Sequence, residues 1–244
     1  MKDPEQSLPA KAAAEIAAAT ATLISEHDVV GTATEVIGRC VRVTAASSAG
    51  VLLADPETGG LDFLAATSHQ AEHLELLQVL QDDGPASEVI RTGRALTFSQ
   101  SELLDRWPPL GRGVRAAGLQ AVHASPMTWQ GTTVGALNLF FADEPSTVEM
   151  APVARAFADL GTLAIVLGRE AGEIDVLTRV RDALTERVVI ELAKGVIAHA
   201  EGIEVAEAFD RLVARAASQG QPLTQAAQAV VDAAERSADK RGES

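Results

Sequence analysis

The sequence is poor in aromatic residues, cysteine and positive charge, and each shortage excludes a class of protein. Tyrosine is absent and aromatic residues make up 3% of the 244 residues, so Val, Leu, Ile and Ala must form the core. The single cysteine, Cys40, excludes an intrachain disulfide framework and a cysteine-based zinc site. Its place on the apolar face of a predicted helix indicates a core residue rather than a reactive one. The net charge of -14 disfavours nucleic-acid binding unless basic residues gather locally.

Long hydrophobic runs are missing as well. Charged residues interrupt every apolar stretch before it reaches the roughly 20 residues that cross a bilayer. The first residues, MKDPEQSLPA, lack the basic start and apolar run of a secretory signal. We therefore expect a cytoplasmic protein that does not contact a membrane. His69 and His73 lie four residues apart on a predicted helix without a third ligand nearby, so we predict no metal and no cofactor.

The residues that are present indicate a globular chain with more than one domain. Hydrophobic residues make up 47% and charged residues 22%, which is enough apolar material to offset the entropy cost of ordering. The chain is about twice the commonest domain length, and strand-like patterns end after Pro145. We predict an amino-terminal helix at 1–27, an α+β domain at 28–168, a connecting helix at 148–188 that overlaps both domains, a helical domain at 174–236 and a disordered tail at 237–244.

Alternating hairpin and helix signals predict the α+β domain. Extended runs at 49–54 and 61–67 flank a turn, and further extended runs lie at 95–98, 119–125 and 133–141. Asp28 is predicted to cap a helix of apolar residues spaced three and four apart, and two more helices are predicted at 69–81 and before Gly93. This order favours an antiparallel sheet with flanking helices.

Only helical patterns follow Pro145. A heptad seam predicts a dimeric coiled coil, and an amphipathic helix packed on its own domain is the alternative. Gly202 and Gly220 are predicted to end two helices, and a third helix is predicted after Pro222 with Thr224 as its cap. The seam consists of Leu160, Leu163, Leu167, Ile174, Leu177, Leu184 and Val188.

The segment from about Thr32 to Val166 resembles a GAF domain, on the phrases LLADPETGG, QDDGPASEVIRTG, WPPL and VGALNLFF. The resemblance implies a twisted antiparallel sheet with helices on its sides and a pocket that often holds a small molecule, here of unknown identity. Ala86 stands where many relatives have cysteine, which excludes a thiol switch at that position. Asn138 is followed by Leu139, where the cyclic-nucleotide signature has lysine. The pocket that the resemblance implies is lined by Phe63, Leu64, Phe98, Trp107, Val122 and Leu137.

A second resemblance, to ANTAR modules, lies in the segment ERVVIELAKGVIAHAEGIEVAEAFDRLVARAASQGQPLTQAAQAVV. ANTAR modules bind RNA hairpins with paired hexanucleotide loops in leader transcripts and prevent terminators from forming, so the resemblance implies RNA as a partner. Lys and Arg side chains supply phosphate contacts to such loops. Gly195 lies inside a helix, where glycine costs about 1 kcal/mol relative to alanine, so either RNA or another backbone is expected close to it. The other RNA-binding candidates are Arg187, Lys194, Arg211 and Arg215.

Several positions that are commonly basic in ANTAR modules are uncharged here, namely Val213, Ala214, Gln221, Pro222 and Thr224. Each lost phosphate contact weakens RNA binding. The main hypothesis is a homodimeric antitermination regulator whose GAF-like domain senses a ligand or partner. One alternative is a diverged sensor that acts by protein contact without binding RNA. The other is a GAF-type small-molecule enzyme, but no catalytic constellation is found, so we predict no enzyme activity.

Overall fold

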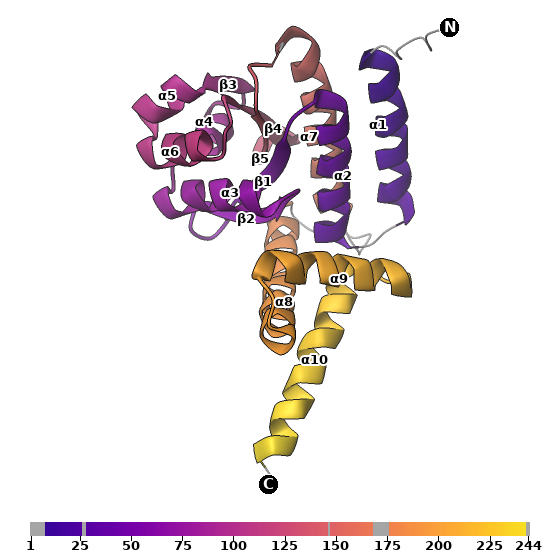
Figure 1. Ribbon diagram of the computed structural model, residues 1–244. Coiled ribbons are helices and arrows are strands. Elements are labelled where there is room, and N and C mark those ends of the chain that lie inside the picture. The colour runs from indigo at the N-terminus through magenta and orange to yellow at the C-terminus, as the bar shows by residue number, and fades with distance from the viewer. Residues whose placement is uncertain (1–7, 26–27, 146, 168–175, 243–244) are drawn as a thin grey trace, which may run out of the picture.

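The computed structural model describes residues 8–25, 28–145, 147–167 and 176–242, and these form a sheet domain with a helical bundle beneath it (Figure 1). The sheet contains five antiparallel strands in the order β2-β1-β5-β4-β3. The predicted antiparallel α+β fold is therefore confirmed. The strands are β1 (Ser48–Ala54), β2 (Leu61–Ala66), β3 (Leu96–Ser99), β4 (Ala121–Trp129) and β5 (Thr132–Phe141).

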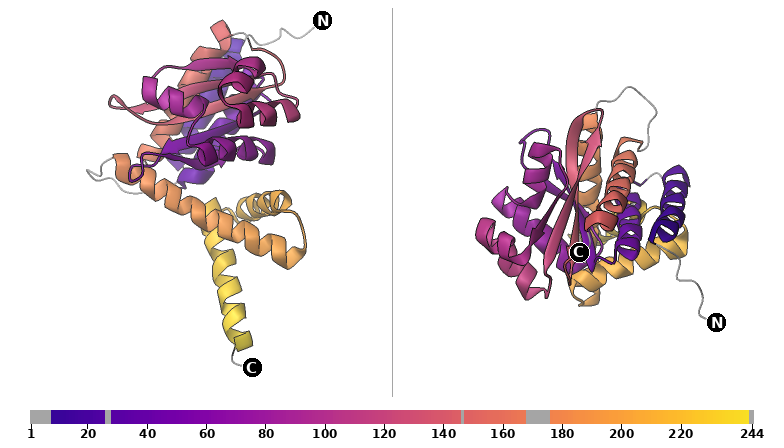
Figure 2. Two further views of the ribbon diagram at one scale, coloured as in Figure 1. Left: turned by 90° about the vertical axis from the view of Figure 1, so that its left-hand side faces the viewer. Right: turned by 90° about the horizontal axis from the view of Figure 1, so that it is seen from above.

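Helices cover both faces of the sheet (Figure 2). One face carries α1 (Leu8–Ser25), α2 (Val29–Thr44) and α7 (Thr147–Val166). The other carries α3 (His69–Gln81), α4 (Pro85–Thr92), α5 (Gln100–Arg106) and α6 (Pro108–Ala116). Helices α5 and α6 are additions to the predicted elements. Local signals explain both, because Ser99 and Glu102 form a capping box at the start of α5 and Pro108 occupies the first turn of α6.

Two described helices cover parts of the predicted connecting helix at 148–188, and residues 168–175 between them lie outside the described residues. Helix α7 ends at Val166, and α8 (Val176–Glu201) begins ten residues later. Because α7 packs against α1 and α2, Leu160 is 9% exposed and belongs to the core of its own domain, as the alternative interpretation of the seam proposed. Leu163 and Leu184 pack partly against the same core, whereas Leu167 and Val188 are exposed. Ile174 and the side chain of Leu177 lie outside the described residues.

The carboxy-terminal bundle consists of α8, α9 (Val205–Gln219) and α10 (Leu223–Gly242). Gly202 and Gly220 follow α8 and α9 with φ angles of 66° and 61°, the left-handed conformation that the predicted helix ends require. The predicted disordered tail at 237–244 is instead helical as far as Gly242, because its Ala, Lys and Arg residues favour a helix. The buried residues of the bundle include Ile190, Ala193, Ile197, Ala208, Leu212, Leu223, Ala227 and Val230.

The bundle packs against the sheet domain through α8, which contacts α2, α7 and β2, and through α10, which contacts α2. Figure 2 shows α8 crossing beneath the sheet domain while α10 extends away from it. The Asp28 carboxylate, which we predicted to cap α2, makes no cap hydrogen bond there and instead accepts one of 3.1 Å from the backbone N–H of Thr224. Helix α10 already begins at Leu223, so Asp28, and not the predicted Thr224 hydroxyl, caps it. None of the described helices is long and apolar enough to cross a membrane.

Candidate functional site

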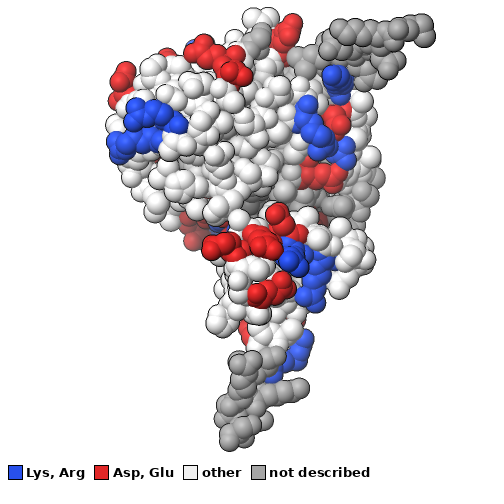
Figure 3. All heavy atoms as spheres, viewed as in Figure 1, with Lys and Arg blue, Asp and Glu red and all other residues white. Residues whose placement is uncertain are grey.

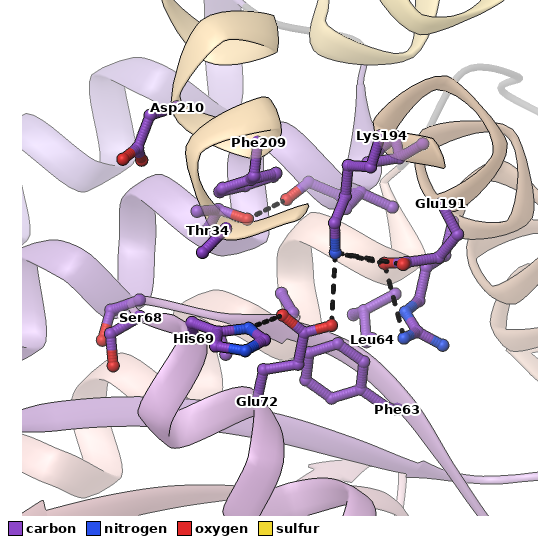
Figure 4. A pocket seen from close by; sticks show the side chains of 17 residues that line it. Thr34, Phe63, Leu64, Ser68, His69, Glu72, Glu191, Lys194, Phe209 and Asp210 are labelled. Atoms are coloured by element: carbon purple, nitrogen blue, oxygen red, sulfur yellow. Dashed lines mark hydrogen bonds and ion pairs between the residues drawn. The ribbon is translucent and has the colours of Figure 1, made fainter. Parts of the chain in front are cut away.

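Lys194, one of the RNA-binding candidates, lies in the contact between the two domains. It projects from α8 toward the start of α3, and its side chain is only 4% exposed (Figure 4). Its ammonium nitrogen lies 3.2 Å from Glu72 Oε1 of the sheet domain and 3.0 Å from both carboxylate oxygens of Glu191 on α8. The positive charge of Lys194 is therefore neutralised within the chain.

Arg187, a second candidate, faces the same contact two turns earlier on α8. Its guanidinium carbon lies 4.1 Å from the centroid of the Phe63 ring, a cation–π arrangement. Its nearest carboxylate oxygens belong to Glu191 at 3.6 Å and Asp62 at 4.0 Å, which is too far for a hydrogen bond. The Nε atom of Arg187 is buried and has no hydrogen-bond partner. Burial lowers the pKa of Arg187, and the surrounding carboxylates raise it.

A cavity of about 330 Å³ opens beside these two cations. It lies between β2 and the start of α3 on one side and α8 and α9 on the other, with α2 beside it. Apolar side chains form much of its wall, including Phe63, Leu64 and Phe209. The polar side chains that line it include Thr34, Ser68, His69, Glu72 and Asp210 (Figure 4).

The six residues predicted for a GAF pocket are not brought together. Phe63 and Leu64 line the interdomain cavity, and Leu137 belongs to the main core on the other side of the sheet from Phe98. Phe98, Trp107 and Val122 pack in a separate core cluster, where the Phe98 and Trp107 rings meet edge-on with centroids 5.1 Å apart.

A buried polar network lies between α3 and the sheet. Glu75 is 0% exposed and accepts hydrogen bonds of 3.0 and 2.8 Å from the Asn138 amide and of 2.8 Å from the Gln78 amide. Burial raises the pKa of Glu75 to about 8, although these hydrogen bonds oppose the shift. An added Cβ at Gly50 would lie 2.3 Å from Glu75 Oε1, so the absence of a side chain at Gly50 makes room for the network.

The remaining RNA-binding candidates are exposed. Arg211 and Arg215 lie on the outer side of α9, and Arg211 pairs with Glu207 at 3.1 Å and with Glu201 at 3.9 Å. Figure 3 shows acidic side chains beside the basic ones over this part of the molecule. An added Cβ at Gly195 would meet no atom within 4 Å, so close packing against another described helix does not explain this glycine.

Sequence reasoning did not identify Asp62 and Glu72 as partners of the basic residues. The side chain of Glu72 is only 17% exposed because α8 covers it. No local sequence pattern predicts this contact. The described residues contain no group of three or more His, Cys, Asp or Glu side chains able to hold a metal, and His69 instead lies 3.5 Å from Glu72.

Comparisons with known proteins agree with both resemblances. The GAF domain of nlh2 from A. aeolicus is 14% identical, with a TM-score of 0.50, over 66% of this chain and 98% of that one. The GAF domain of an Acinetobacter phosphoenolpyruvate-protein phosphotransferase is 11% identical, with a TM-score of 0.49, over 67% of this chain and 97% of that one. No curated protein matches the chain.

Family models account for both domains. The ANTAR domain model matches residues 178–231, which form the three-helix bundle, and the GAF domain model matches residues 25–166. Both are families of regulatory rather than catalytic domains. The chain therefore belongs to the GAF domain family and carries a carboxy-terminal ANTAR domain.

Proposed function

We propose that this protein binds RNA hairpins with paired hexanucleotide loops through its ANTAR domain and promotes transcription antitermination. The observation that carries the proposal is the ANTAR match over residues 178–231, which include parts of all three helices of the bundle. Arg211 and Arg215 lie four residues apart on the exposed side of α9, where one RNA backbone can reach both side chains.

The contact between the domains supports a regulated form of this activity. Lys194 and Arg187 face Glu72 and Asp62 of the GAF domain, so an RNA phosphate must compete with these carboxylates. We propose that the described arrangement is the state with low RNA affinity. A signal sensed by the GAF domain then raises RNA affinity by separating the two domains and exposing both cations.

The direct test measures RNA binding of the full chain across a salt series. We expect the double variant Arg211→Ala, Arg215→Ala to bind a paired-hexaloop hairpin more weakly, with a salt slope lower by about 1 for each lost phosphate contact. The matched control is Arg155→Ala, an arginine of similar exposure on α7 that pairs with Asp159 outside the bundle. Equal loss in the double variant and the control would contradict an RNA face on α9.

A second pair of variants tests the role of the GAF domain. Glu72→Gln removes a carboxylate partner of Lys194, so we expect RNA affinity to rise. Glu88→Gln is the control, because Glu88 pairs with Arg91 and Arg106 inside the GAF domain. An RNA affinity that Glu72→Gln leaves unchanged would contradict the proposed low-affinity state, while the experiment on α9 would still test RNA binding.

We also propose that the chain forms a homodimer, and the exposed apolar side of α8 supports this. Val188 is 56% exposed and Leu192 is 54% exposed, and they lie one turn apart beside the exposed Gly195. The variant Val188→Asp places a charge on this surface, so we expect sedimentation equilibrium to report a shift toward monomer. If Val188→Asp still forms the dimer to the same extent, this surface does not belong to the dimer interface.

A second candidate function is that of a diverged sensor that contacts a protein and does not bind RNA. The mixed charge of α9 and the burial of Lys194 favour it. The same salt series distinguishes the two functions, because a chain without RNA affinity fails to bind the hairpin even at low salt. In that case Glu72→Gln would also fail to bind the hairpin.

A further inference from the structure

We propose that the cavity between the GAF and ANTAR domains binds a small molecule with an oxyanion, a carboxylate or phosphate, attached to an apolar body. The observation that carries the proposal is the set of contacts that Arg187 makes and lacks. Arg187 lines the cavity, and its side chain is 17% exposed. Its Nε has no hydrogen-bond partner, and its nearest carboxylate oxygens lie at 3.6 and 4.0 Å.

A buried Nε–H without a hydrogen bond is energetically unfavourable, because this donor has lost water and gained no acceptor. Carboxylates and phosphates match its planar set of donors and accept two parallel hydrogen bonds from it. An oxyanion that enters the cavity beside Arg187 therefore supplies the acceptors that Asp62 and Glu191 fail to supply.

Lys194 places a second cation beside the cavity. Its ammonium group lines the same cavity, and its three donors form hydrogen bonds with the carboxylates of Glu72 and Glu191. These carboxylates are engaged with Lys194 and so repel an incoming anion less than free ones would. Asp210, the other carboxylate of the lining, is exposed and lies on the opposite side of the cavity from Glu191 (Figure 4).

The shape and lining of the cavity indicate the rest of the ligand. A volume of about 330 Å³ is at the lower end of the range for small-molecule sites, which corresponds to a compact metabolite. Phe63, Leu64, Ile190 and Phe209 form apolar walls from both domains. These walls favour an aromatic or branched aliphatic body over a bare ion.

Such a ligand would stabilise the contact between the two domains, because residues of both domains line the cavity and contribute to binding only while the domains are together. This consequence rests on the proposed function. If RNA requires Lys194 and Arg187 to be free, the ligand lowers RNA affinity and RNA lowers ligand affinity by the same factor. The ligand is thus expected to act as a signal for termination.

Calorimetry of the full chain tests the site without RNA. The probes are benzoate and phenyl phosphate, which distinguish a carboxylate from a phosphate on the same ring. Benzyl alcohol keeps the ring without the anion, and acetate and inorganic phosphate keep the anion without the ring. We expect saturable binding of at least one aromatic oxyanion to one site per chain, with much weaker binding of all three control compounds.

Variants then assign the binding to Arg187. We expect Arg187→Gln to weaken binding about tenfold or more, and Arg187→Lys to weaken it as well, because lysine keeps the charge but loses the planar pair of donors. The matched control is Arg181→Gln on the same helix, since Arg181 pairs with Glu57 outside the cavity, and we expect it to bind like the unmodified chain. Thermal unfolding of each variant establishes that it is folded.

Three results would overturn the proposal: neither aromatic oxyanion binds, Arg187→Gln and Arg181→Gln bind equally well, or benzyl alcohol binds as tightly as benzoate. Adding the bound probe to the hairpin titration then tests the predicted decrease in RNA affinity. A chain that never binds the hairpin contradicts the proposed function alone, because calorimetry reports on the cavity independently.

Discussion

The substitution Glu75→Gln should remove a pH-dependent loss of stability from the GAF domain. Glu75 is fully buried, and burial raises its pKa to about 8. Glutamine has the same shape and remains neutral at every pH. The Asn138 amide oxygen is buried without a partner, so it can accept a hydrogen bond from the new glutamine after the Asn138 amide rotates.

The expected magnitude follows from the difference between the folded and unfolded states. In the unfolded chain Glu75 has its ordinary pKa of 4.5, so between about pH 4.5 and 8 the folded state keeps a proton that the unfolded state releases. The folded state binds more protons, and the free energy of unfolding therefore falls as the pH rises. The slope is about 1.4 kcal/mol per pH unit and the total loss about 5 kcal/mol, most of it complete at about pH 8.

Denaturant unfolding followed by tryptophan fluorescence measures this effect, because Trp107 and Trp129 both belong to the GAF domain. We expect Glu75→Gln to match the unmodified chain within about 1 kcal/mol near pH 4.5 and to exceed it by several kcal/mol near pH 8.5. The control is Glu144→Gln at an exposed position. A stability difference that stays constant over this pH range would refute the raised pKa.

Three further predictions concern single residues. Gly195→Ala should raise the free energy of unfolding by about 0.5–1 kcal/mol, because an added Cβ meets no atom within 4 Å; a lower value in chemical denaturation would mean that the site is crowded. Burial raises the pKa of Cys40 to about 12, so a thiol reagent at neutral pH should modify it only as fast as the chain opens, and immediate modification would contradict its place in the core. Asp28→Ala removes the hydrogen bond to the Thr224 N–H and should lower the free energy of unfolding by about 1 kcal/mol, whereas unchanged stability would show that this cap contributes nothing.

Local patterns in the sequence determined the secondary structure of this protein well. Strands β1, β2, β3 and β5 begin and end within one residue of the predicted extended runs, whereas β4 ends four residues after its predicted run. Gly202 and Gly220 end helices as predicted. These features depend on neighbours in the chain, because alternation and helical spacing arise from the geometry of a single strand or helix. Helices α5 and α6 were missed, although the capping box of Ser99 and Glu102 and the first-turn Pro108 mark their starts.

The connecting segment shows where local patterns stop being sufficient. A heptad spacing cannot distinguish a seam between two chains from a helix face buried in its own domain, because both require the same apolar stripe. Leu160 is buried in its own domain, because α7 packs on α1 and α2.

The candidate site also has features that the sequence predicted and features that only the tertiary structure shows. The sequence alone identified the ANTAR segment and its cations, because both are carried by residue types at particular positions. Only the tertiary structure placed Glu72 against Lys194 across 122 residues of chain, and Asp62 near Arg187. The physical reason is that ion pairs and cavities between domains depend on how two folded surfaces meet. The exposed fraction of a charged side chain therefore depends on residues that are distant in the sequence. Lys194 and Arg187, which the sequence predicts to bind RNA, line a cavity in the folded chain.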